Sequence, residues 1–131
     1  HTPAALEKIL LTLRAHTQNN LHVVFGCGGD RDPGKRPEMG AAAIKFADHV
    51  IVTDDNPRSE NPSAIRAAIM AAALGAEEVA GRDAAIARAM TKLETGDVLV
   101  VAGKGHETTQ IIGSETLHFV DAEHIRKAAG Q

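Results

Sequence analysis

Three short runs of apolar, mostly β-branched residues constrain the fold of this 131-residue chain more than any other feature. Val98 to Ala102 is an uninterrupted apolar run, and Leu21 to Phe25 and His49 to Val52 are similar in kind. A strand without polar alternation is typical of a sheet that is covered on both faces. The three runs therefore predict a mostly parallel sheet buried between two layers of helices.

The segments between these runs supply the helices. Thr2 is predicted to cap the first helix, with Pro3 at its first position, and Gly75 to stop the third. Helical spacing and stop signals predict helices over 3–16, 37–47, 62–74, 83–93 and 121–129. A short strand is expected at 78–80, and strands at 110–112 and 117–119 are expected to pair as a C-terminal β-hairpin. The expected fold class is α/β, a Rossmann-like three-layer domain.

Composition limits both size and partners. The length fits one domain and is short for a complete multi-substrate enzyme. The net charge of -3 mixes both signs, and no basic–aromatic stripe suggests a nucleic-acid partner. Cys27 is the only cysteine, which fits a reducing compartment such as the cytoplasm. No apolar run predicts a membrane span. The chain begins at His1 without an initiator Met, so we expect a fragment whose first residues say nothing of targeting.

Each of the three apolar runs ends in a loop that carries glycine, charge or both. These loops are Gly26 to Arg36, Thr53 to Arg58 and Gly103 to Glu107. In a parallel sheet the loops after the strands share one edge, where ligands of α/β proteins bind. The sequence therefore predicts that their polar groups converge on one ligand.

The second loop has the chemistry to hold a zwitterion. Arg58 can bind a carboxylate through two parallel hydrogen bonds, and Asp54 or Asp55 can accept from an ammonium group. Taken alone, Asp55-Asn56-Pro57 is also typical of a turn that caps the following helix. The other two loops favour the binding interpretation.

The first loop resembles a phosphate-binding loop only in outline. Gly29 to Lys35 fits the spacing G-x4-G-K between a strand and a helix. However, Arg36 stands where a magnesium-binding Ser or Thr is needed, and Pro33 removes a backbone donor. The alternatives are a loop that offers Arg31, Lys35 or Arg36 to a ligand and a solvated charged turn.

The third loop places His106 and Glu107 beside two glycines. No Ser, Cys or metal-ligand partner for His106 is apparent at a useful spacing, so Glu107 as an acceptor for a ligand ammonium is the simpler role. Cys27 is interpreted as a small buried residue rather than a nucleophile. The remaining histidines are scattered and are interpreted as structural or solvated.

Four segments in order resemble the C-terminal domain of the Mur ligase family, over essentially the whole chain. They are His1-Thr2-Pro3 with Ala5-Leu6-Glu7, Phe25 to Asp32 with Lys35-Arg36-Pro37, Asp55-Asn56-Pro57-Arg58, and Val101 to Glu107. The third is similar to the signature of family members that take meso-diaminopimelate rather than lysine. The resemblance implies that 1–131 is the amino-acid-binding domain of an ADP-forming ligase of peptidoglycan synthesis. The resemblance also implies that the family's N-terminal UDP-substrate domain and central ATPase domain lie outside this chain.

The same resemblance implies roles for individual residues. The meso-diaminopimelate pocket is expected to consist of Arg31, Asp55, Asn56, Arg58, Gly103 and Glu107. His1, Thr2, Lys35 and Arg36 are expected to face the nucleotide, although Ala4 departs from the acidic residue expected there. No catalytic residue and no metal ligand are assigned to this chain. ATP and Mg²⁺ are expected to bind mainly to the central domain, and UDP-N-acetylmuramoyl-dipeptide to the rest of the ligase.

Two other functions remain as alternatives. One is a stand-alone binding module for a small zwitterion or nucleotide. The other is a dinucleotide-binding domain, which is disfavoured because Gly26 to Gly29 lack the G-x-G-x-x-G spacing and Arg31 stands at the third glycine.

Overall fold

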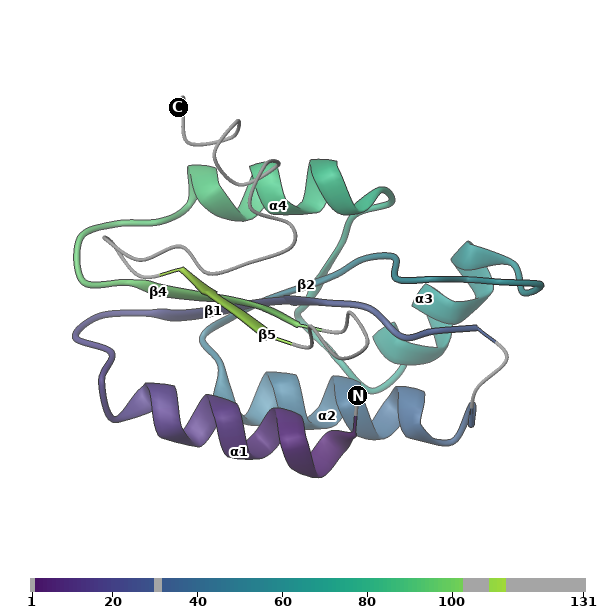
Figure 1. Ribbon diagram of the computed structural model, residues 1–131, viewed down its shortest axis with the longest axis horizontal. Coiled ribbons are helices and arrows are strands. Elements are labelled where there is room, and N and C mark those ends of the chain that lie inside the picture. The colour runs from purple at the N-terminus through teal and green to yellow at the C-terminus, as the bar shows by residue number, and fades with distance from the viewer. Residues whose placement is uncertain (1, 30–31, 103–108, 113–131) are drawn as a thin grey trace.

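The chain forms one five-stranded sheet between two layers of helices (Figure 1). The computed structural model describes residues 2–29 and 32–102, and the backbone of 109–112. The helices are α1 (Pro3–Arg14), α2 (Lys35–Phe46), α3 (Pro62–Met70) and α4 (Arg82–Thr91). The strands are β1 (Leu21–Phe25), β2 (His49–Val52), β3 (Glu77–Glu78), β4 (Val98–Ala102) and β5 (Thr109–Ile112).

The strand order is β3-β2-β1-β4-β5. The pairs β1–β2, β1–β4 and β2–β3 are parallel, and β5 runs antiparallel to β4. The predicted parallel α/β sheet is therefore confirmed. The second strand of the expected hairpin and the last expected helix lie outside the described residues.

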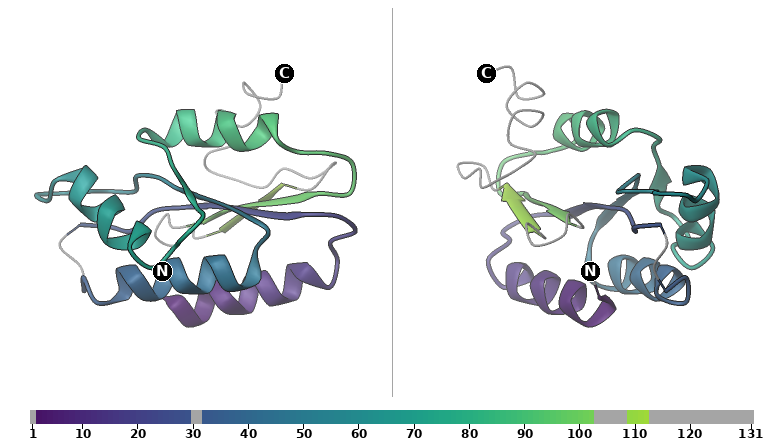
Figure 2. Two further views of the ribbon diagram at one scale, coloured as in Figure 1. Left: turned by 180° about the vertical axis from the view of Figure 1, so that it is seen from behind. Right: turned by 45° about the vertical axis from the view of Figure 1, so that its right-hand side comes forward.

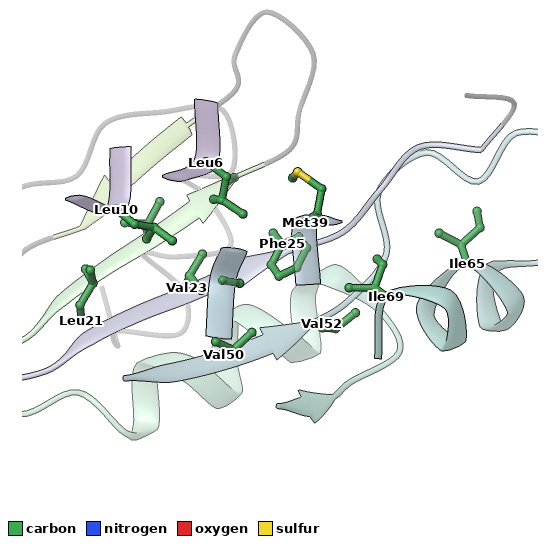
Figure 3. Close-up of a cluster of buried hydrophobic side chains, with 13 residues drawn as sticks. Leu6, Leu10, Leu21, Val23, Phe25, Met39, Val50, Val52, Ile65 and Ile69 are labelled. Atoms are coloured by element: carbon green, nitrogen blue, oxygen red, sulfur yellow. The ribbon is translucent and has the colours of Figure 1, made fainter. Parts of the chain in front are cut away.

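Helices cover both faces of the sheet, and this explains why its central strands lack polar alternation. One core joins α1, α2 and α3 to alternate residues of β1, β2 and β4, among them Val23, Phe25 and Val52 (Figure 3). The intervening residues, such as Val24 and Val101, pack against α4 on the opposite face. Figure 2 shows the sheet between these two helical layers.

The predicted and observed element boundaries agree best in the three central strands. β1, β2 and β4 occupy the predicted residues, whereas α1 and α3 end earlier than expected. After α3, the amides of Ala72 and Ala73 bond three residues back, to Ile69 and Met70, so the alanine-rich segment continues as tight turns. β3 is shifted and only two residues long. No helix in the described part of the chain is long and apolar enough to cross a membrane.

Asp97 links the segments that precede β1 and β4, at the amino ends of the strands. Its carboxylate accepts hydrogen bonds from the backbone amides of Asn20 (2.9 Å) and Glu94 (3.0 Å) and lies 2.8 Å from Nε2 of His22. Burial alone would raise the pKa of Asp97, but these hydrogen bonds outweigh it and lower the pKa below its usual 3.8. His22 is itself buried and stacks on His49, which places it in a structural role.

Candidate functional site

The site lies where the strand order changes direction. β2 and β3 lie on one side of β1 and β4 lies on the other, so the loops after β1 and β4 diverge at this point. Phe25 and Ala102, the last residues of β1 and β4, are paired neighbours. The third predicted loop therefore starts beside the first, although Gly103 to Glu107 are outside the described residues.

The loops after β1 and β2 pack against each other through their backbones. The amide of Thr53 donates to the carbonyl of Phe25 (2.9 Å), and that of Gly29 donates to the carbonyl of Asn56 (2.7 Å). A Cβ atom at Gly26 would lie 2.5 Å from the oxygen of Thr53, and one at Gly29 only 1.8 Å from that of Pro57. Both positions therefore require glycine, because the backbones of the two loops lie too close together for a side chain.

A pocket of about 430 Å³ opens beside this junction. The loop after β1 contributes Gly26, Cys27 and Gly28, and the loop after β2 contributes Asp55, Asn56 and Arg58. The other described lining residues come from around the starts of α1 and α2: Thr2, Asp32, Lys35, Arg36 and Met39. Acidic and basic groups thus share one wall, an arrangement that suits a ligand carrying both carboxylate and ammonium groups.

Arg58 is held in an unfavourable backbone conformation. Its φ is +51°, and it is the only described residue other than glycine with positive φ. Such a conformation costs about 1–2 kcal/mol in a residue with a side chain. Its Nη1 donates to the carbonyl of Gly29 (2.8 Å), and it forms no ion pair with a carboxylate in the described part of the chain. Its remaining guanidinium N–H groups suit a ligand carboxylate.

Arg36 has an internal partner that the sequence did not reveal. Its guanidinium makes a two-pronged contact with Glu60, at 3.0 Å from Nη1 to Oε2 and 2.7 Å from Nη2 to Oε1. The Arg36 side chain is only 7% exposed. Lys35, by comparison, lines the pocket from the exposed surface. Glu60 lies 24 residues from Arg36 in sequence, and no local pattern links them.

The two adjacent aspartates of the second loop have different roles. Asp54 forms an ion pair with Arg66 and accepts from the amide of Gly81 (2.8 Å), so its carboxylate anchors the loop to α3 and to the start of α4. Asp55 lines the pocket. Of the two carboxylates considered for a ligand ammonium, Asp55 is therefore the one in position.

Cys27 lines the pocket as a neutral thiol. Burial raises its pKa to about 11, an effect that the nearby Arg36 only partly opposes. A nucleophilic cysteine needs a lowered pKa, so this environment agrees with the structural role expected of Cys27.

The remaining site predictions fall outside the described residues. These are His1, Arg31, Gly103, His106 and Glu107. Within the described ranges, no group of three or more His, Cys, Asp and Glu side chains is arranged to hold a metal ion.

Comparison with known proteins identifies the family. A family model described as "Mur ligase, glutamate ligase domain" matches residues 1–105. The chain belongs to this Mur ligase family. Its pocket is thus a site of a Mur ligase domain, lined in part by three of the four segments that carry the sequence resemblance.

Relatives of this Mur ligase domain are much longer proteins. The UDP-N-acetylmuramoyl-L-alanyl-D-glutamate--2,6-diaminopimelate ligase of Mesorhizobium japonicum is 61% identical over 128 residues, covering 98% of this chain and 26% of the relative. The ligase of the same name from Rhizobium meliloti is 58% identical over 130 residues, covering 99% and 27%. A solved structure of a ligase so named superposes with a TM-score of 0.80 at 38% identity, covering 99% of this chain and 28% of that one. The chain spans about a quarter of the length of these relatives.

Proposed function

We propose that this chain is the amino-acid-binding domain of an ADP-forming ligase that adds meso-diaminopimelate to UDP-N-acetylmuramoyl-L-alanyl-D-glutamate in peptidoglycan synthesis. The observation that carries this proposal is the single pocket in which Asp55, Asn56 and Arg58 meet the glycine-rich loop. The two named relatives, which are 61% and 58% identical, support the choice of substrate.

The pocket chemistry matches the amino acid. Meso-diaminopimelate carries two carboxylates and two ammonium groups. Arg58 binds the distal carboxylate, with Asn56 beside it, and Asp55 adds negative charge for an ammonium group. Arg31 takes a carboxylate, while Glu107 and the carbonyl of Gly103 receive the distal ammonium.

The same arrangement explains discrimination against lysine. L-Lysine lacks the distal carboxylate and leaves the Arg58 guanidinium without its ligand partner. A site built around a charged hydrogen bond rejects a ligand that cannot form it, by about 1.5–3 kcal/mol per bond.

In the whole ligase, ATP phosphorylates the terminal carboxylate of the UDP-linked substrate and leaves ADP. The amine of diaminopimelate then attacks the acyl phosphate, loses a proton and displaces phosphate, which forms the amide. This domain presents the amine, with Thr2, Lys35 and Arg36 on the side that faces the nucleotide. ATP and Mg²⁺ bind mainly outside this chain. The ligase works in the cytoplasm, where a single unpaired cysteine such as Cys27 stays reduced.

A titration followed by amide NMR tests the pocket. We expect meso-diaminopimelate to shift the signals of Arg31, Asn56, Arg58 and Glu107, and L-lysine and ATP to shift them far less. An equal response to L-lysine, or shifts confined to the opposite edge around His49 and Glu77, would contradict the assignment.

A hybrid enzyme tests the whole function. In this hybrid, the chain replaces the matching quarter of the Mesorhizobium japonicum relative. We expect ADP release that depends on meso-diaminopimelate. A folded hybrid that releases no ADP with this amino acid would favour the stand-alone binding module.

A further inference from the structure

The Arg36–Glu60 ion pair joins the two loops that form the pocket. Arg36 starts from the first turn of α2, and Glu60 belongs to the loop between β2 and α3. Besides its two contacts with Glu60, Arg36 donates from Nη2 to the carbonyl of Gly28 (3.4 Å). One buried guanidinium thus contacts the glycine-rich loop and the second loop at once.

Glu60 also ends the turn that carries Arg58. Its amide donates to the carbonyl of Pro57 (2.9 Å), which places Arg58 at the first central position of a four-residue turn. Positive φ at this position favours glycine, so an arginine stays there only if its surroundings hold it. Glu60 fixes one end of the turn, and the carbonyl of Gly29 holds the side chain of Arg58 within it.

Glu60 is not among the residues that line the pocket. The contacts above tie it to two described residues that do line the pocket, Arg36 and Arg58.

We propose that Glu60 is a positioning residue for meso-diaminopimelate: through Arg36 and the turn of Pro57 to Glu60, it fixes the guanidinium of Arg58 for the distal carboxylate. This inference rests on the proposed function. It assigns to Glu60 the setting of amino-acid affinity and selectivity.

The first test uses this chain and needs no ligand. Glu60→Gln keeps the side-chain volume and removes the charge that pairs with Arg36. We expect the Nε–H signal of Arg58 and the amide signals of Gly29 and Asn56 to shift. Glu77→Gln is the matched control, because Glu77 is likewise ion-paired, in its case with Arg88 and Lys92, and its side chain is 34% exposed against 33% for Glu60. Unchanged Arg58 and Gly29 signals in Glu60→Gln would overturn the proposal.

The second test measures kinetics in the hybrid ligase. We expect Glu60→Gln to raise the KM for meso-diaminopimelate about tenfold, with small changes in kcat and in the KM for ATP. Because Glu60 acts through Arg58, Glu60→Gln should add little to the loss already caused by Arg58→Ala. Additive losses, or equal changes in the KM for ATP, would overturn the proposal and indicate general destabilisation.

A double variant covers the case in which Glu60→Gln fails to fold. Arg36→Met with Glu60→Leu removes both charges and leaves no buried guanidinium without its carboxylate. We expect this protein to fold and still to show a raised KM for meso-diaminopimelate. A wild-type KM in the double variant would overturn the inference, whereas a folded wild-type hybrid with no diaminopimelate-dependent ADP release would refute the proposed function itself.

Discussion

Gly29 is the residue at which the site tolerates least change. Its amide bonds to Asn56, its carbonyl accepts from Arg58, and its α-carbon faces the backbone of Pro57. A side chain here has no room, because a Cβ would lie 1.8 Å from a backbone oxygen that no rotamer change can move.

We therefore expect Gly29→Ala to separate the two loops. The variant should lose about 1–3 kcal/mol of unfolding free energy, measured by urea denaturation, because at least one loop must shift and its hydrogen bonds weaken. It should also lose the NMR response to meso-diaminopimelate.

Gly75→Ala is the control for this prediction. Gly75 has a φ of +93° but open space around its α-carbon. Alanine at this position should cost about 1 kcal/mol through backbone strain alone and leave the response to the amino acid intact. If both variants lost the NMR response to meso-diaminopimelate equally, the close packing of the two loops at Gly29 would not be what the response depends on.

Among the elements, the central strands could be predicted from the sequence and the helix ends could not. β1, β2 and β4 pack against helices on both faces, so their sequences are mostly apolar, with Val, Ile, Leu and Phe at almost every position. The end of α3 is different, because Ala71, Ala72 and Ala73 favour a helix by propensity, whereas the structure continues after Met70 in tight turns. β3 has only two residues, too few to show any periodicity.

Asp97 ties together the segments that precede β1 and β4, and it should make the fold sensitive to acid. Its pKa is lower in the folded state than the usual 3.8, so its ionised form stabilises the fold above that pH. This contribution is lost as the pH falls through the folded-state pKa.

We expect wild-type protein to lose more unfolding free energy than Asp97→Asn as the pH falls from about 5 to about 3. Thermal melts across that range measure the difference. Asp48→Asn serves as the comparison, because the Asp48 side chain is 36% exposed and its ion pair with Arg14 is screened by solvent. A steeper pH dependence in Asp97→Asn than in wild type would contradict the assignment.

At the scale of the whole molecule, the sequence predicted that polar groups gather at one edge of the sheet but not how they are supported. The structure brings Thr2, Lys35, Arg36, Asp55, Asn56 and Arg58 to one pocket at that edge, and its role in binding the amino acid stays a prediction. The pairing of Arg36 with Glu60 could not be predicted, because it depends on how α2 and the second loop pack in three dimensions. The nucleotide contacts of Thr2, Lys35 and Arg36 stay predictions.

The chain alone should bind without catalysing. The reaction needs an ATP site and a UDP-substrate site, and we place both outside these 131 residues. We expect no ADP release from the isolated chain with ATP, meso-diaminopimelate and the UDP-linked substrate, under conditions in which the hybrid ligase is active. ATP-dependent amide formation by the isolated chain would contradict this division of labour.

The brevity of β3 has a consequence for how the protein behaves among its own copies. An outer strand with free backbone groups is a template on which a second polypeptide can extend the sheet. Here that border is two residues long, and both are glutamates held by arginine or lysine side chains of neighbouring helices and turns. Little unsatisfied backbone is left for another chain to pair with, and ion-paired charged side chains flank what remains. On this side the sheet is protected against fibril-like growth.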